Sequence, residues 1–417
     1  MVIESRASEV CSSVNSSSHK HINVDELDRE STCAIFAQVP FGNTCVMKEN
    51  RRDRNMTYKR LGDYIREVNV RNRELKVTNL LGVSISKEFI PSIANTIGTD
   101  MSTYKIVERG QFAYGPVTSR NGDKVSIALL DAYDDAIISQ AYTVFEIIDQ
   151  ELLLPEFLMM WFRRPEFDRY ARFHSHGSAR EIFDWDELCD VMLPIPSITR
   201  QREIVSEYET LTNRIRLNNQ MIQNLEATAQ ALYRKTFVDK IDKENLPKGW
   251  RIGTIGDMFE LQRGFDLPSQ NRKDGEYPIY ASTGIAEYHN QYKVETPCIV
   301  TGRSGTIGKV FYVDKKCWPL NTTLWVKDFK GTPAFFVYYK LIELELEKTI
   351  SGFAAVPTLN RNDVHMMEST IPPKYLLEKF ENEMKVIHHH KSITKQENSK
   401  LTELQSLLLA KMGQEII

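Results

Sequence analysis

The sequence has few of the features that mark secreted, membrane-spanning or metal-binding proteins. Its 6 cysteines are scattered and form no Cys-x-x-Cys pair, so neither a zinc site nor a disulfide framework is indicated. No run of about eighteen apolar residues is present, and we therefore expect no membrane-spanning helix. The first residues contain no apolar signal-peptide core, which favours a cytoplasmic protein.

Motifs for common enzymatic chemistry are missing as well. In the glycine-rich stretch 302–310, Arg303 stands where a Walker A loop needs glycine, and Val310 stands where it needs serine or threonine. No glycine fingerprint for dinucleotides follows a predicted strand, and there is no Asn-Pro-Pro-aromatic stretch of the kind that holds a base for amino methylation. We therefore expect that this chain catalyses nothing alone and binds no cofactor or metal.

The histidines form two groups, and neither predicts a metal site. His388, His389 and His390 are consecutive on a predicted helix, so their side chains point in three directions about 100° apart. This spacing argues against a shared metal ion, and we interpret the three residues as part of a solvated face. His174 and His176 fall in a predicted loop, where we interpret them as incidental.

The composition is that of a globular protein large enough for two or three domains. The chain has 417 residues, of which 41% are hydrophobic and 26% charged, so each domain can bury a core. The net charge of -3 gives no direct support for nucleic-acid binding. A nearly neutral chain can still carry a local basic surface, so this charge does not exclude such binding.

The strongest pattern is a long helix after residue 198, in which apolar residues recur in alternating steps of four and three. This spacing is typical of a helix that packs along another helix, and the predicted length is roughly 55 Å. The predicted interface residues of this helix are Ile204, Tyr208, Leu211, Ile215, Ile222, Leu225 and Leu232. The same spacing returns in a second long helix, with Phe380, Met384, Ile387, Leu401 and Leu408. We expect the two helices to form an antiparallel coiled-coil pair.

The middle of this pair is predicted to be polar. Asn218 occupies an interface position near the middle of the first helix, and the second helix is polar from His388 to Ser399. In an antiparallel pairing these regions would meet, where a polar layer costs stability but fixes the register. Alternatively, the middle is simply solvated.

The remaining sequence predicts an α+β fold in which two similar domains of mixed strands and helices are separated by the helix pair. Turn and linker signals, including Leu193-Pro194-Ile195-Pro196, give the boundaries. The predicted segments are an extension at 1–55, a first domain at 56–198, a long helix at 199–238, a linker at 239–250, a second domain at 251–373 and a second long helix at 374–412. The extension is serine-rich and charged, and we expect it to be poorly ordered.

Within each domain, alternating and β-branched segments predict strands, and each domain contains one amphipathic helix. The predicted strands are 82–86, 104–107, 112–114, 125–129, 141–147, 298–301, 309–313 and 322–326. The predicted helices are 156–173 and 333–350. The order domain, helix, domain, helix indicates an internal duplication with a pseudo-two-fold repeat.

Several segments, in their order and repeat spacing, resemble the specificity (S) subunit of type I restriction–modification systems. The matching segments are Tyr58–Asp63, Leu193–Ser197 with Gln201 and Ile204, Leu246–Trp250 with Ile255–Asp257, and Gly302–Gly308. The resemblance covers residues 56–412. One departure is that Leu377-Glu378 stands in the second copy where the first has Gln201-Arg202.

The resemblance implies that each domain is a target-recognition domain that reads one half of a bipartite sequence in double-stranded DNA. The helix pair would set the length of the unread spacer. The partners would be two methyltransferase (M) subunits that use S-adenosylmethionine to methylate adenine, and possibly restriction (R) subunits that use ATP and Mg. This chain would be the non-catalytic specificity subunit of that complex.

Contacts with bases need planar or bidentate donors on loops, so side chains of this kind in polar turns are the candidates. The candidates in the first domain are Ser119, Arg120, Asn121 and Lys124. The candidates in the second domain are Asn271, Arg272, Lys273, Arg303, Ser304 and Thr306. The alternative for each is a turn residue that is exposed by default. An alternative for the whole protein is an intracellular coiled-coil scaffold with two peptide- or glycan-binding domains.

Overall fold

The computed structural model describes residues 58–92, 98–118, 121–122, 124–177, 180–349 and 358–414. The chain divides into two units, Met1–Asn55 and Met56–Ile417, and all described residues belong to the second. The extension predicted at 1–55 lies outside the described residues. Among those that are described, no helix combines the length and apolarity needed to cross a membrane.

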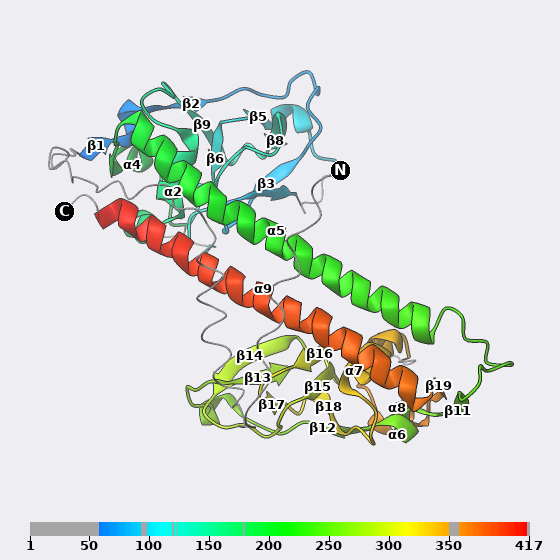
Figure 1. Ribbon diagram of the computed structural model, residues 1–417. Coiled ribbons are helices and arrows are strands. Elements are labelled where there is room, and N and C mark those ends of the chain that lie inside the picture. Colours follow the sequence, from blue (N-terminus) through cyan, green and yellow to red (C-terminus); the bar gives the residue numbers. More distant parts are fainter. Residues whose placement is uncertain are drawn as a thin grey trace, which may run out of the picture. The chain divides into compact units, whose positions relative to one another are not determined.

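Two long helices run side by side in opposite directions (Figure 1). They are α5 (Ile198–Phe237) with 40 residues and α9 (Lys374–Gln414) with 41 residues. The antiparallel direction is evident from the hydrogen bonds between them, because Thr212 bonds to Gln405 and Asn218 bonds to Asn398. The predicted fold class, with two α+β domains separated by an antiparallel helix pair, is therefore confirmed.

The first domain is built from ten short strands and three helices within its described residues. The strands are β1 (Tyr58–Arg60), β2 (Ile65–Val68), β3 (Leu81–Val83), β4 (Phe89–Pro91), β5 (Lys105–Glu108), β6 (Phe112–Tyr114), β7 (Ile127–Leu129), β8 (Asp135–Ile138), β9 (Thr143–Ile147) and β10 (Met192–Pro194). The helices are α2 (Pro155–Arg163), α3 (Pro165–Phe173) and α4 (Trp185–Cys189), with 3-10 turns at Leu61–Asp63 and Met101–Thr103. The largest sheet has the order β2-β9-β6-β7, all antiparallel.

The single helix predicted at 156–173 is wrong, because the structure has two helices there. Helix α2 ends at Arg163, and Arg164 has an extended conformation with φ -69° and ψ 136° before Pro165 begins α3. Proline lacks the backbone N–H and its ring disfavours a helical conformation in the preceding residue. The apolar periodicity continued across this break and concealed it.

The second domain has nine strands and three helices within its described residues. The strands are β11 (Arg251–Thr254), β12 (Glu260–Arg263), β13 (Tyr277–Ala281), β14 (Gly284–His289), β15 (Cys298–Gly302), β16 (Val310–Val313), β17 (Trp318–Pro319), β18 (Thr323–Asp328) and β19 (Glu368–Ile371). The helices are α6 (Ile255–Met258), α7 (Ala334–Glu343) and α8 (Arg361–Met366), with 3-10 turns at Ser269–Asn271 and Leu346–Thr349. The helix predicted at 333–350 thus ends earlier, at Glu343, where Glu345 turns to a positive φ of 43°.

The two domains share a plan. Each contains a four-stranded antiparallel sheet, β2-β9-β6-β7 in the first and β12-β18-β15-β16 in the second. In each, the first strand of the domain pairs antiparallel with the last one, β1 with β10 and β11 with β19. The long helix follows this last strand in both copies.

Each domain core includes opposite ends of both long helices. In the first domain, Ile204 near the start of α5 shares a cluster of buried side chains with Met412 near the end of α9. In the second domain, Tyr233 and Phe237 near the end of α5 share a cluster with Phe380 near the start of α9. The helix pair is therefore fixed to a domain at each end.

The predicted interface residues fall into three groups along the helices. Ile204, Tyr208 and Leu408 belong to or pack against the first domain core, and Leu232, Phe380, Met384 and Ile387 do the same in the second. Leu211, Ile215, Ile222, Leu225 and Leu401 lie between them and are half-buried. Apolar packing between the helices is thus strongest near the domains.

Polar residues meet at the middle of the pair. Asn218 is only 2% exposed, and its Nδ2 donates a hydrogen bond to Asn398 Oδ1 at 2.9 Å. Asn398 Nδ2 in turn donates to Asn219 Oδ1 at 2.8 Å. Ion pairs of Arg214 with Glu397 and of Lys391 with Glu226 lie on either side. The polar layer considered from the sequence is present, and it couples the registers of the two helices.

His388 is not on a solvated face, in contrast to the prediction for the three histidines. Its ring is half-buried against Phe335, with centroids 4.2 Å apart, and its Nε2 lies 2.9 Å from Tyr339 Oη. Burial lowers the pKa of His388 to about 4, assisted by the neighbouring Lys391. His389 and His390 are exposed.

Candidate nucleic-acid interface

In the first domain, the predicted contact residues lie between β6 and β7. We define the domain 1 turn as the described residues Val117, Thr118, Asn121, Gly122, Lys124 and Val125. The Asn121 N–H donates to Thr118 O at 2.9 Å, and the Thr118 N–H donates to Glu181 O at 3.0 Å. Ser119 and Arg120, predicted to contact bases, lie outside the described residues.

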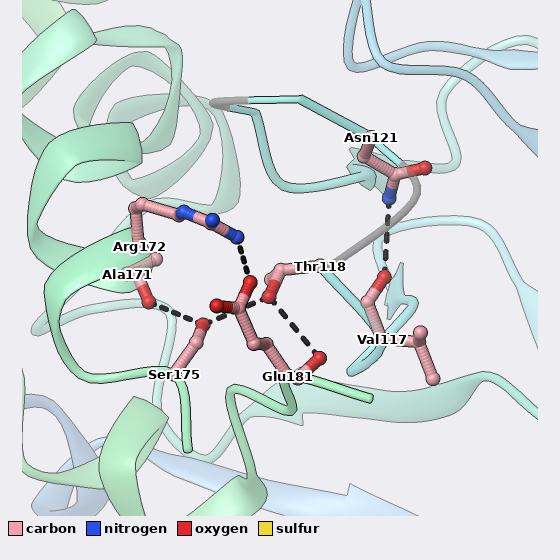
Figure 2. Close-up of polar contacts among 7 residues, drawn as sticks. All are labelled: Val117, Thr118, Asn121, Ala171, Arg172, Ser175 and Glu181. Atoms are coloured by element: carbon pink, nitrogen blue, oxygen red, sulfur yellow. Dashed lines mark hydrogen bonds and ion pairs between the residues drawn. The ribbon is translucent and has the colours of Figure 1, made fainter. Parts of the chain in front are cut away.

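The two described candidates in the domain 1 turn have different surroundings. The side-chain amide of Asn121 donates to Val117 O at 3.2 Å and lies 3.3 Å from Ser126 Oγ, so its nitrogen faces the protein (Figure 2). Lys124 is exposed. Lys124 is therefore the better placed of the two to reach a ligand, whereas Asn121 helps to shape the turn.

The turn is attached to the segment that follows helix α3. The Thr118 hydroxyl lies 2.9 Å from Ser175 Oγ, and Ser175 in turn donates to Ala171 O at 2.6 Å. Figure 2 shows both contacts. An ion pair joins Arg172 of α3 to Glu181, whose carbonyl oxygen accepts from the Thr118 N–H. Backbone and side-chain bonds thus hold the first part of the turn against α3.

The second domain has a groove lined with arginines. Its cavity volume is about 590 Å³. Among its lining residues, Arg263 ends β12, Arg303 follows β15 and Arg361 begins α8. Gln262 and Asn360 also line it. Five side chains with planar hydrogen-bond donors from three elements therefore converge on one concave surface.

Arg303 is held in this groove by its backbone. Its N–H donates to Thr322 O at 2.9 Å, and its carbonyl accepts from the Leu359 N–H at 2.8 Å. The guanidinium groups of Arg303 and Arg361 form no hydrogen bond or ion pair with another described residue. The backbone is thus fixed while these two charged groups remain available to a ligand.

The glycine-rich stretch after β15 is a tight turn. Ser304 pairs with Thr358 in an isolated bridge, and Thr306 is exposed. A Cβ added at Gly302 would lie 1.8 Å from Thr306 O, so only glycine fits at that position. The stretch therefore presents Arg303 at the groove and Thr306 to solvent, and it has no helix after it to complete a phosphate loop.

The third predicted group, Asn271 to Lys273, contains two exposed residues and one residue that is bound to the rest of the protein. Asn271 and Lys273 are exposed, but the Arg272 side chain is only 18% exposed. Arg272 forms an ion pair with Glu287 at 3.1 Å and donates to Leu267 O. The Arg272 guanidinium therefore holds the loop against β14.

Two groove residues, Arg263 and Arg361, were missed by sequence reasoning. Both are basic residues at the end of one element or the start of another, which is a weak signal. Nothing in the sequence shows that they lie beside Arg303, because the fold alone brings these distant segments together.

His174 and His176 both face Glu187, at 2.9 and 3.4 Å, and no group of three metal-binding side chains occurs in the described part of the chain.

Comparison with known proteins identifies the second half of the chain. Residues 247–411 match the family model described as the type I restriction modification DNA specificity domain. This segment is a type I DNA specificity domain. The resemblance inferred from the sequence is thereby confirmed, and the arginine groove lies within the specificity domain.

The curated relatives of this chain are distant. The specificity subunit of the type I restriction enzyme HindI from Haemophilus influenzae is 28% identical over 137 residues, which are 32% of this chain and 29% of the relative. The MjaIX specificity subunit from Methanocaldococcus jannaschii is 22% identical over 288 residues, which are 59% of this chain and 66% of the relative. The chain thus spans less than two thirds of the length of either relative.

A solved structure shares the fold of the whole unit. The type I restriction–modification S subunit from M. genitalium superposes with a TM-score of 0.54 at 15% identity, covering 87% of this chain and 97% of that one. The likeness therefore extends beyond the specificity domain at 247–411 to the first domain and both long helices.

Proposed function

We propose that this chain is the subunit that reads DNA sequence in a type I restriction–modification complex. The observation that carries the proposal is that a type I specificity domain is combined with a second domain of the same plan across an antiparallel helix pair. Each domain reads one half of a bipartite target in double-stranded DNA. The scaffold with peptide- or glycan-binding domains is not favoured, because the matched family is a DNA specificity family.

The arginine groove provides the chemistry for this function in the second domain. The planar guanidinium fork of Arg303 or Arg361 fits a phosphate or the O6 and N7 atoms of guanine, each with two hydrogen bonds. Ser304, Thr306, Asn271 and Lys273, which are not among the residues that line the groove, remain further candidates for contact with DNA. The groove supplies the local basic surface that the net charge of the chain does not predict.

In the first domain, Lys124 is the described candidate for contact with DNA, with Asn121 shaping the turn that carries it. Ser119 and Arg120 remain predictions. These first-domain residues contact the half of the DNA target that the second domain does not read.

The helix pair fixes the distance between the two domains. At 1.5 Å per residue, the 40 residues of α5 span about 60 Å. Since each domain holds one end of both helices, the length of the pair determines how many base pairs remain unread between the half-sites.

Catalysis belongs to partner subunits in this proposal. Two methyltransferase subunits bind S-adenosylmethionine and methylate adenine, and restriction subunits, if present, use ATP and Mg. Exposed apolar side chains along the helices, including Leu217, Met221, Leu404 and Leu407, are consistent with a surface that is covered in a complex. The chain itself contributes specificity and no catalytic residue.

Sequencing of methylated DNA tests the proposal. Genomic DNA from cells that express the partner subunits should carry a bipartite motif with methylated adenine when this chain is present and lose it when the gene is deleted. Copurification with two methyltransferase copies per chain is the second expected result. A bipartite motif that persists unchanged without this chain would refute the proposal.

A further inference from the structure

A buried ion pair lies directly behind the domain 1 turn. Lys87, between β3 and β4, donates from its Nζ to Asp168 Oδ1 of helix α3 at 2.7 Å. The two side chains are only 5% and 12% exposed. The same Nζ donates to the carbonyl oxygen of Phe162 near the end of α2.

This arrangement is unfavourable for Lys87 in two respects. Its φ of 66° is in the left-handed region, which residues with a side chain rarely adopt. Its ammonium is removed from water, and this burial lowers the pKa of Lys87 although the contact with Asp168 opposes the shift. Strained and buried charged residues often occur near functional sites, and such a pair is weak evidence for stability alone.

Asp168 connects the ion pair to the domain 1 turn. The Oδ1 atom that accepts from Lys87 also accepts from the Val125 N–H at 3.1 Å. Val125 directly follows Lys124, the exposed candidate for DNA contact. The ion pair therefore fixes the backbone at the last residue of the turn.

Helix α3 also holds the start of the turn. Ala171 O accepts from Ser175, whose Oγ lies against the Thr118 hydroxyl (Figure 2). The two ends of the turn are therefore held by Asp168 within α3 and by Ser175, two residues after the last residue of α3. Helix α3 and the segment that directly follows it thus fix both ends of the turn.

We propose that the buried Lys87–Asp168 pair is a positioning element for the domain 1 turn and determines how strictly the first domain discriminates among DNA half-sites. The inference rests on the proposed function. Neither residue touches DNA. Asp168 holds Val125 in place, Lys87 orients Asp168, and Lys124 is presented to DNA in one conformation.

A purely stabilising pair would behave differently. Replacing a buried ion pair by apolar residues of similar size is often neutral or favourable for stability, because the cost of desolvating two charges disappears. The replacement also removes the acceptor for the Val125 N–H, so the turn is released. Half-site discrimination should therefore fall in a variant whose stability does not fall.

The test uses the complete complex with its methyltransferase partners and a plasmid library in which each base of both half-sites is varied. In the double variant Lys87→Met/Asp168→Leu, discrimination against single-base changes in the first half-site should fall about tenfold. Discrimination at the second half-site and the thermal midpoint should not fall. The control is Arg109→Ala/Asp134→Ala, an exposed ion pair in the same domain, which should alter neither ratio.

Three outcomes would overturn the inference: an unchanged discrimination ratio in a folded double variant, equal relaxation at both half-sites, or the same relaxation in the Arg109 control. If the double variant does not fold, Lys87→Met/Asp168→Ala takes its place, because it also removes the acceptor for the Val125 N–H, and an unchanged ratio in that variant has the same meaning. A wild-type complex that yields no bipartite motif refutes the proposed function itself, and the inference fails with it. The library therefore distinguishes a failure of the proposed function from a failure of the role inferred for the ion pair.

Discussion

Lengthening the helix pair should lengthen the unread spacer by a predictable amount. Two cross-helix contacts, Asn218 with Asn398 and Glu226 with Lys391, frame the central part of the pair. Four residues of high helix propensity inserted between 220 and 221 in α5, and four between 394 and 395 in α9, leave both contacts intact. The insertion adds about 6 Å to the pair, because each helical residue rises 1.5 Å.

The expected change in DNA is close to two base pairs. Successive base pairs are about 3.4 Å apart, so 6 Å corresponds to roughly two of them. Four residues at 3.6 per turn also rotate one domain by about 40° relative to the other, while two base pairs rotate the half-sites in the same sense by about 70°, which leaves a mismatch of about 30°. The mismatch is small enough for DNA twist to absorb it, and both half-site sequences should stay unchanged.

Methylation sequencing in cells that carry the variant gives the spacer length directly. The control has the insertion in α5 alone, which displaces Asn218 and Glu226 relative to each other without a matching change in α9. This control should lose most methylation, since one of the two contacts must break. A doubly extended variant that methylates the original motif with its original spacer would refute the idea that the helices set the distance.

Three further predictions follow from the second domain and its contact with α9. Arg303→Ala should weaken binding to duplex DNA by about 1–3 kcal/mol in fluorescence anisotropy with no change in thermal midpoint, whereas Arg272→Ala should lower the midpoint because it breaks the ion pair that holds its loop. Equal loss of stability in both variants would contradict this distinction. The pKa of His388 is about 4 when folded and near 6.5 when unfolded, so the unfolded chain binds the proton first and stability should fall as pH drops from 6.5 to 4. The His388→Phe variant should flatten this part of a pH series of urea denaturation curves, and an unaltered slope would exclude the histidine as its source. Gly302→Ala should destabilise the second domain by a few kcal/mol in calorimetry, since its Cβ would collide with Thr306 O, and a neutral result would show that the turn can move.

The long helices could be predicted from the sequence because their signal is local and repeated. Apolar residues such as Leu211 and Ile215 recur in the same pattern over many turns, and only a helix pair explains such a run. The strand at 143–147 was similarly evident from its β-branched and aromatic residues. The break at Pro165 was accessible from the sequence in principle, but the continuing apolar period obscured it.

The candidate sites were less predictable because they depend on partners far away in the sequence. Arg272 and Arg303 have the same chemistry and both lie in polar turns. Only the fold shows that Glu287 engages the first, whereas the second faces a groove beside Arg361. His388 was misjudged for the same reason, because the aromatic side chains that bury it come from α7 and β16.

The ends of α9 and α5 have a consequence for how the chain is made. Leu409 and Met412, which are synthesised long after the first domain itself, complete the core of that domain. The first domain therefore keeps an open apolar surface until α9 has been synthesised. A chain that stops before residue 409 should lose order at its beginning as well as at its end.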